Sequence, residues 1–182
     1  MRVLLHTCCG PCSCYPVRSL RREGHDLTAL FYNPNIHPYR EFERRLDTLR
    51  QFAEGEGLEV IVRDDFDIHS YLRGALEAPT KRDQCRLCYA PRLGEAAREA
   101  RERGFDAFST TLLVSPYQDH ESVRDAGEAA AAGHGVGFLY RDFRPGWRET
   151  MEAARLKGLY RQGYCGCIFS EAERYRRQGR SG

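Results

Sequence analysis

The sequence predicts an α/β fold, a three-layer sandwich built on a mainly parallel sheet of about five strands. Short apolar runs alternate along the chain with amphipathic segments of helical spacing, which is the pattern of repeated strand-helix-strand units. The first run, Val3-Leu4-Leu5, is followed by a turn at Gly10-Pro11. Its loop is therefore expected at the carboxyl edge of the sheet, where such folds bind ligands.

Five segments have the composition of buried strands, because they are short, apolar and bounded by turn-forming residues. They are residues 3–5, 27–32, 58–62, 105–113 and 136–140. Helical segments separate them, so neighbouring strands should run parallel and be joined by right-handed crossovers.

The helices are expected to pack apolar faces on this sheet. The first follows the cysteine-rich loop, with Ser13 as its cap. The second, residues 38–54, has an apolar face made of Phe42, Leu46, Leu49 and Phe52. Residues 77–84 are polar and expected to be irregular, which places Cys85 at the start of a helix. Further helices are expected at residues 68–72, 85–104 and 121–132 and on both sides of residues 164–167.

No linker, repeat or low-complexity block divides the sequence, which predicts one domain over residues 1–182 with a helical part at about 141–182 flanking the sheet. No apolar stretch approaches the ~20 residues that a membrane span requires. Met1-Arg2 leads directly into a strand rather than into a signal peptide. We therefore expect a cytoplasmic protein without a membrane partner.

The net charge of +2 is unevenly distributed. Residues 141–182 hold ten Lys or Arg against five Asp or Glu, a balance of +5 that leaves −3 for residues 1–140. A basic segment of this kind could follow a phosphate backbone, although charged helix faces are commonly only solvated. Its cations include Arg155, Lys157, Arg161, Arg174, Arg176, Arg177 and Arg180.

Four of the eight cysteines, Cys8, Cys9, Cys12 and Cys14, fall within seven residues of the first loop. In a reducing compartment this usage favours metal binding or redox chemistry over structural disulfides. Cys85-x-x-Cys88 presents two more thiolates on one side of a helix, and joined to Cys8-Cys9 it gives four ligands for zinc or for an iron–sulfur cluster. Adjacent side chains diverge, so the Cys8-Cys9 pair favours the cluster.

More than one chemical role is consistent with the other cysteines. Cys9-Gly10-Pro11-Cys12 is similar to the thioredoxin dithiol, although that reading leaves the remaining cysteines unexplained. Cys165-Gly166-Cys167 could form a strained, labile disulfide suited to electron transfer, or remain a metal-ligand pair or two free thiols. Cys12 could ligate a second metal or act as a redox thiol. Cys14 is expected in the core.

Taken together, six segments resemble the epoxyqueuosine reductases of the QueH family. They are LLHTCCGPCS (4–13), YNPNI (32–36), CRLC (85–88), FSTTL (108–112), SPY (115–117) and LYRQGYCGCIFS (159–170), and they occur in family order over nearly the whole chain. The resemblance implies a single catalytic domain with a nucleotide-hydrolase or HUP-like relative of the Rossmann fold.

The resemblance also implies the activity, an oxidoreductase that removes the epoxide oxygen of epoxyqueuosine at the wobble position of tRNA, the last step of queuosine biosynthesis. The implied partners are a tRNA with a queuosine-type anticodon and an unidentified electron donor. It further implies a [4Fe-4S] cluster on Cys8, Cys9, Cys85 and Cys88 and a redox-active disulfide between Cys165 and Cys167. A second, mononuclear iron is expected beside the cluster, with Cys12 as its candidate ligand.

Other polar and aromatic residues are weaker candidates for the site. Possible metal ligands or proton donors near strand ends are Asp65, Asp119 and His120, whereas His6 is expected to be a hydrogen-bonded neighbour of the site. Aromatic surfaces for an unpaired base are Tyr32, Tyr117, Trp147 and Tyr164.

Two other functions remain open from the sequence. One is a zinc-stabilised tRNA-binding module without catalysis, in which the four cysteines only hold structure. The other is an ATP-dependent tRNA sulfur-transfer enzyme, which would carry a Gly- and Ser-rich phosphate loop where this chain has cysteines.

Overall fold

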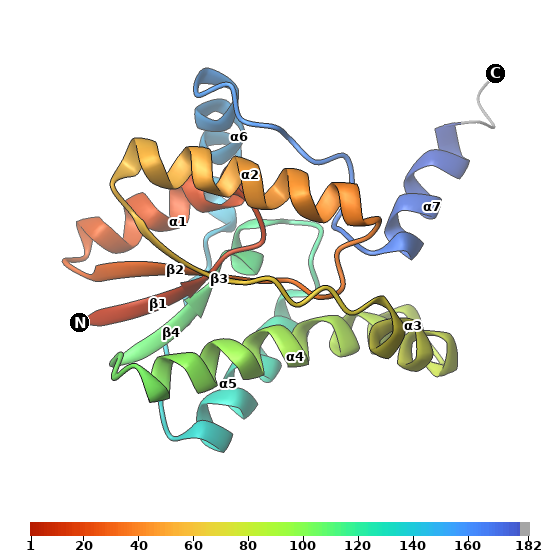
Figure 1. The fold of residues 1–182 in the computed structure, drawn as a ribbon, viewed down its shortest axis with the longest axis horizontal. Helices are drawn as coiled ribbons and strands as arrows, with labels where there is room; N and C mark the ends of the chain where they lie inside the picture. Colours follow the sequence, from red (N-terminus) through yellow and green to blue (C-terminus); the bar gives the residue numbers. More distant parts are fainter. Residues whose placement is uncertain (179–182) are drawn as a thin grey trace.

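The computed structural model describes residues 1–178 and contains a sheet of five parallel strands in the order β3-β2-β1-β4-β5 (Figure 1). The strands are β1 (Arg2–His6), β2 (Asp26–Tyr32), β3 (Glu59–Arg63), β4 (Ala107–Thr110) and β5 (Gly137–Phe138). This confirms the predicted fold class, and the order is that of a Rossmann-like sheet. β1 is central, and its Val3, Leu4 and Leu5 are completely buried.

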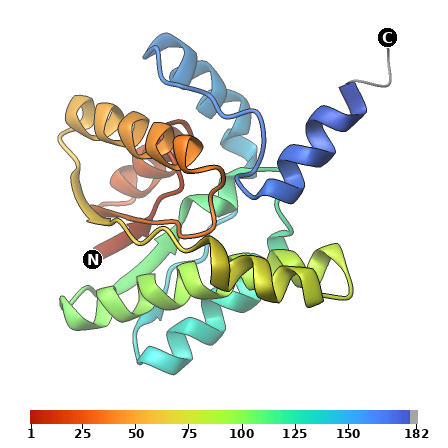
Figure 2. The ribbon, with the colours of Figure 1, turned by 45° about the vertical axis from the view of Figure 1, so that its right-hand side comes forward.

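Helices lie on both sides of the sheet, which makes the three layers. On one side are α1 (Gly10–Arg22), α2 (Tyr39–Glu56) and α6 (Trp147–Leu156), and on the other are α4 (Lys81–Glu102) and α5 (His120–His134) (Figure 1). Helix α3 (Ile68–Glu77) packs on α4. Helix α7 (Ile168–Gln178) stands beyond the carboxyl ends of the strands (Figure 2). Two short 3-10 helices are η1 (Thr111–Val114) and η2 (Arg144–Gly146).

The apolar face predicted for α2 is buried as expected. Phe42, Leu46, Leu49 and Phe52 are each at most 6% exposed. Arg45 lies on the same face and is only 1% exposed. A charged side chain at such a position must be paired, because burying an isolated charge is costly.

Two helix starts differ from the prediction. Helix α1 begins at Gly10 with Cys9 at its cap, and Ser13 instead donates its hydroxyl hydrogen to the Cys9 carbonyl at 2.9 Å. Pro11 explains this early start, because its fixed φ suits the first helical turn. Helix α4 begins at Lys81, since Thr80 caps it by accepting a hydrogen bond from the Asp83 amide at 3.2 Å.

Because α4 begins earlier than predicted, the cysteine pair occupies a different place in the helix. Cys85 and Cys88 lie in the second turn of the helix rather than at its mouth, still on one face because they are three residues apart. The strand expected at 105–113 is also shorter. It ends at Thr110, whose hydroxyl accepts a hydrogen bond from the Leu112 amide at 3.1 Å and so starts η1.

Within residues 1–178, none of the helices is both long enough and apolar enough to cross a membrane.

Candidate functional site

The site lies at the topological switch point of the sheet, between the neighbouring strands β1 and β4, where the strand order changes direction. Loops that follow such strands diverge and leave a crevice between them. Here Cys8 follows β1 and Thr111 follows β4, and they are joined by two hydrogen bonds. The Cys8 amide donates to Thr111 Oγ1 at 3.2 Å, and the Thr111 hydroxyl donates to Cys8 Sγ at 3.6 Å.

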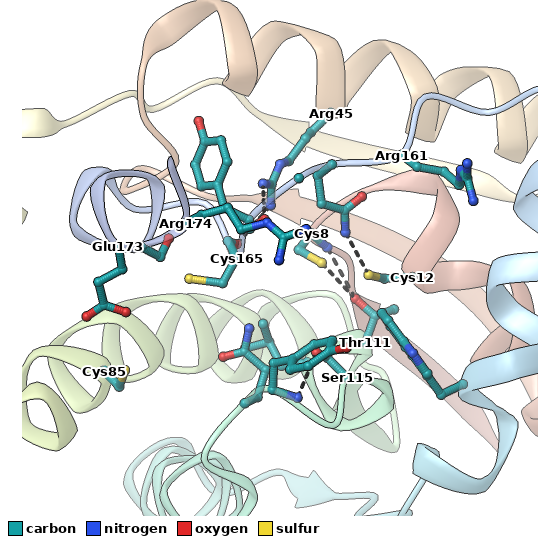
Figure 3. A pocket seen from close by; sticks show the side chains of 18 of the residues that line it. Cys8, Cys12, Arg45, Cys85, Thr111, Ser115, Arg161, Cys165, Glu173 and Arg174 are labelled. Atoms are coloured by element: carbon teal, nitrogen blue, oxygen red, sulfur yellow. Dashed lines mark hydrogen bonds between the residues drawn. The ribbon is translucent and has the colours of Figure 1, made fainter. Parts of the chain in front are cut away.

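A cavity of about 600 Å³ opens at this point (Figure 3). That volume is within the range of small-molecule sites. Thiols from three separate parts of the chain line it, since Cys8, Cys12, Cys85 and Cys165 all contribute. The remaining wall comes from the β4 loop, from α6, from the segment after α6 and from α7, and includes Thr111, Ser115, Tyr117, Trp147, Met151, Arg161, Gln162, Tyr164, Glu173 and Arg174.

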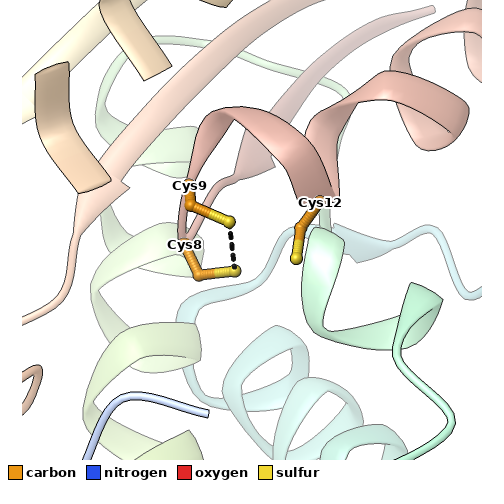
Figure 4. A group of neighbouring side chains, drawn as sticks. All are labelled: Cys8, Cys9 and Cys12. Carbon is orange, nitrogen blue, oxygen red and sulfur yellow. Dashed lines mark hydrogen bonds between the residues drawn. The ribbon is translucent and has the colours of Figure 1, made fainter. Parts of the chain in front are cut away.

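Cys8, Cys9 and Cys12 form the closest group of thiols (Figure 4). Their sulfur atoms all lie within 4.8 Å of one another, and Cys8 Sγ is 3.8 Å from Cys9 Sγ. Hydrogen bonds from Cys12 and Cys9 hold the pKa of Cys8 well below its ordinary value. Burial raises the pKa of Cys9, so Cys8 is the thiol of this group that loses its proton more readily. Such a group could hold a metal ion, because thiolates are soft ligands suited to iron and zinc.

The cavity also contains a buried cation beside these thiols. Arg45 donates from Nε to Glu41 Oε1 at 2.8 Å, from Nη1 to the Cys165 carbonyl at 2.9 Å and from Nη2 to the Tyr164 carbonyl at 2.8 Å. Burial alone would lower the pKa of Arg45, but negative charge on the first-loop thiols and on Glu41 outweighs it and raises that pKa. The guanidinium therefore favours thiolate character in the first loop.

The mid-chain pair, Cys85 and Cys88, does not belong to this close group of thiols. Cys85 lines the cavity and Cys88 follows one helical turn later, with its carbonyl accepting a hydrogen bond from Asn35 Nδ2 at 3.3 Å. Burial raises the pKa of both thiols. The structure thus places one cysteine of each predicted ligand pair, Cys8 and Cys85, on the same cavity. Both pairs are free thiols, so the donor chemistry suits iron–sulfur ligation.

Cys165 and Cys167 lie in a turn fixed against the start of α2. The Gly166 carbonyl accepts a hydrogen bond from the His37 amide at 2.8 Å. Gly166 has φ +136°, and a Cβ there would lie 3.1 Å from Ile36 Cγ1, so a side chain at this position would be strained and crowded. A hydrogen bond from Cys165 lowers the pKa of Cys167 to about 5. Cys167 is therefore a thiolate at neutral pH, which suits thiol-disulfide chemistry.

The polar residues predicted near strand ends do not all have the expected place in the site. Asp65, Asp119 and His120 do not line the cavity, and Asp119 instead caps α5 and pairs with Arg82 at 2.9 Å. His6 is hydrogen-bonded, as expected, with Nδ1 2.9 Å from Thr110 Oγ1 and Nε2 3.1 Å from the Tyr32 carbonyl. Burial lowers its pKa to about 4, so it is neutral at pH 7.

Three of the four aromatic candidates, Tyr117, Trp147 and Tyr164, line the cavity, whereas Tyr32 does not. Among the predicted C-terminal cations, Arg161 and Arg174 line it as well. Arg180 lies outside the described residues.

Several lining residues were not predicted as site residues from the sequence, among them Arg45, Thr111 and Gln162. Gln162 donates from Nε2 to Cys12 Sγ at 3.2 Å, while its buried Oε1 has no partner among the described residues. Arg45 had a detectable signal, because it interrupts the apolar face of α2. The Thr80-x-x-Asp83 capping pattern likewise marked the true start of α4.

A Rossmann-like sheet whose switch-point cavity is lined by reactive thiols defines a class of α/β proteins suited to thiol-based redox chemistry. Comparison with known sequences identifies the family. The family model described as Epoxyqueuosine reductase QueH matches residues 3–173. This chain belongs to that family and is an oxidoreductase, as its motifs predicted.

Individual members of the family are similar in sequence to this chain over most of their length. The Epoxyqueuosine reductase QueH of Dehalococcoides mccartyi is 34% identical over 96% of this chain and 94% of its own. Those of Acinetobacter baylyi and Thermotoga maritima are 35% and 33% identical, covering 93% and 94% of this chain and 80% and 91% of their own.

A solved structure shares the fold. It is a protein described as a predicted subunit of tRNA methyltransferase from Methanocaldococcus jannaschii, with a TM-score of 0.58 at 12% sequence identity. The match covers 85% of this chain and 74% of that protein. At this identity the likeness concerns the fold alone.

Proposed function

We propose that this protein reduces epoxyqueuosine to queuosine at the wobble position of tRNA, completing queuosine biosynthesis, with residues 1–182 acting as a single catalytic domain in the cytoplasm. The printed name of its relatives supports the substrate. The observation that carries the proposal is the single cavity onto which Cys8, Cys12, Cys85 and Cys165 converge from distant parts of the chain.

The reaction converts an epoxide into an alkene. Both carbon–oxygen bonds break, the oxygen leaves as water, and two electrons and two protons are consumed. The Cys165 and Cys167 pair can supply both electrons, because forming one disulfide from the Cys165 thiol and the Cys167 thiolate releases two electrons and one proton, and solvent supplies the second proton. The low pKa of Cys167 supports this role, since the thiolate is the form that reacts. An external electron donor must then reduce the disulfide.

We assign Cys8, Cys9, Cys85 and Cys88 as ligands of a [4Fe-4S] cluster, which when bound supplies one-electron transfer. Cys12 is the candidate ligand of a second, mononuclear iron, which would act on the epoxide oxygen as a Lewis acid. The first-loop ligands are supported by the close grouping of Cys8, Cys9 and Cys12 and by Arg45, whose charge favours thiolates there. Cys85 and Cys88 lie outside that group, and Cys85 lines the same cavity. Thr111 keeps Cys8 in place through its two hydrogen bonds.

Turnover is the decisive experiment. The protein, purified without oxygen, is incubated with tRNA carrying epoxyqueuosine and a chemical reductant, and the digested nucleosides are analysed by mass spectrometry. Loss of one oxygen atom from the modified nucleoside is the expected result. Unchanged epoxyqueuosine with an intact cluster would overturn the proposal, and turnover that requires ATP would favour a sulfur-transfer type of chemistry.

Metal analysis of the same preparation tests the cluster separately. A brown protein with about four irons and four sulfides per chain supports it. A colourless protein with one zinc per chain would instead support the non-catalytic, zinc-stabilised module.

A further inference from the structure

Tyr117 is exposed at the mouth of the cavity in a way that core packing does not explain. Its residue exposure of 82% is the largest among the bulky apolar residues of the described chain. The turn that carries it is nevertheless anchored. The Tyr117 amide donates to Ser115 Oγ at 3.3 Å, and the side chain of the next residue, Gln118, accepts a hydrogen bond from the Tyr89 hydroxyl at 2.7 Å. A fixed backbone thus presents a free aromatic ring.

Trp147 completes an aromatic corner with this ring. The ring centroids of Tyr117 and Trp147 are 5.9 Å apart and their planes meet at 86°, and both side chains line the cavity. Trp147 begins α6 directly after Gly146, which packs so closely on Tyr15 that a Cβ would lie 2.2 Å from its ring. The indole therefore starts from a constrained backbone, while the face of Tyr117 is open to solvent.

Positive charge accompanies the corner on the cavity wall. Arg161 and Arg174 are exposed and line the same cavity (Figure 3), and neither forms an ion pair with another residue of the described range 1–178. Lys81, by contrast, is paired with Glu173. An aromatic surface next to free guanidinium groups suits unpaired nucleotides, whose bases stack on the ring while their phosphates attract the cations.

We propose that the Tyr117–Trp147 corner is a stacking platform for an unpaired nucleobase of the anticodon loop at the mouth of the cavity. The identity of the partner as tRNA rests on the proposed function. The corner itself is defined by geometry: one ring is held at the start of α6, the other is free on one face, and both border the space that the thiols occupy.

The chain provides its own probe, because Trp147 is its only tryptophan. An anticodon stem-loop RNA with guanosine at the wobble position is titrated into the holoprotein while intrinsic fluorescence is recorded. Anisotropy of the same RNA, end-labelled, gives an independent dissociation constant. We expect fluorescence quenching on binding and a loss of affinity of roughly tenfold or more in Tyr117→Ala, because one base–aromatic stack is removed.

Two variants serve as controls. Tyr117→Phe keeps the ring and should bind within about twofold of the parent, since stacking needs no hydroxyl group. Tyr39→Ala removes another exposed tyrosine, which stacks on Phe42 and does not line the cavity, and should leave RNA affinity unchanged. Unfolding midpoints of all variants show whether Tyr117→Ala remains folded.

The outcomes separate this inference from the proposed function. Equal RNA affinity of the parent and Tyr117→Ala, or no RNA binding by the parent in either assay, would overturn the platform. Tyr117-dependent RNA binding by a parent protein that fails to reduce epoxyqueuosine would instead keep the platform and overturn the proposed activity.

Discussion

Arg45 Nη1 donates a hydrogen bond to the backbone carbonyl of Cys165 at 2.9 Å, from a position that is only 1% exposed. The same guanidinium is ion-paired with Glu41, which also accepts a hydrogen bond from the Tyr160 hydroxyl at 2.6 Å. One buried ion pair therefore joins α2 to the turn that carries the proposed redox dithiol. Arg45 thus places a charged side chain on the buried face of α2, at a position that an apolar residue would otherwise occupy.

Replacing Arg45 by Met should destabilise the protein by about 3–5 kcal/mol, because it leaves the buried Glu41 carboxylate without its partner. Urea unfolding followed by circular dichroism measures this change. Arg50→Met is the matched control on the same helix, because Arg50 is exposed and its contact with Asp47 is a surface pair. Equal losses of unfolding free energy in the two variants would contradict the structural role of Arg45.

Replacing Gly10 by Ala should destabilise the protein by about 1–3 kcal/mol through overpacking. A Cβ at Gly10 would lie 2.2 Å from the backbone carbonyl oxygen of Thr48, which cannot move as a flexible side chain would. Thermal unfolding measures the effect. At Gly133 in α5 a Cβ meets nothing within 4 Å, so Gly133→Ala should leave stability unchanged or raise it. A Gly10→Ala protein as stable as the parent would show that α1 does not approach α2 this closely.

Replacing Cys85 by Ala should abolish the visible absorption of the cluster, because one of its four proposed ligands is lost. Cys14→Ala is the control, because Cys14 is buried, does not line the cavity and is not one of the proposed ligands. Absorption spectra and iron content of the two variants, purified without oxygen, provide the comparison. Full iron content in Cys85→Ala would remove that residue from the ligand set.

Replacing Cys165 by Ala should leave the cluster spectrum intact and lower the reduction of epoxyqueuosine sharply, since the dithiol can no longer close into a disulfide. Single-turnover assays with tRNA carrying epoxyqueuosine measure the rate. Turnover at the parental rate would exclude the dithiol as the source of the electron pair.

Alkylation of Cys167 by iodoacetamide should depend on pH with a midpoint near 5, because its lowered pKa keeps the reactive thiolate present above that pH. The rate should be nearly constant from pH 7 upward and fall below pH 5. Removing the hydrogen bond in Cys165→Ala should move the midpoint up toward the ordinary thiol value of about 8.5. Peptide mass spectrometry of the reduced protein follows Cys167 specifically, and identical midpoints in both proteins would be inconsistent with this hydrogen bond.

Much of the fold was predictable because its signals are local. Hydrophobic periodicity placed the strands and the buried face of α2, and the alternation of strands and helices predicted a parallel sheet. The prediction was wrong at ends of elements, where a single cap decides. Thr80 moved the start of α4 ahead of Cys85, and Thr110 ended β4 early.

The sequence by itself determined that a cysteine-rich loop follows the first strand and that two further cysteine pairs occur downstream. Only the tertiary structure decided that Cys12 groups with Cys8 and Cys9, and that Arg45 reaches a carbonyl 120 residues away. The physical reason is the sequence separation over which each effect acts. Propensity and periodicity act over a few residues, whereas these contacts depend on how the crossovers bring α1, α2 and the turn before α7 to one edge of the sheet.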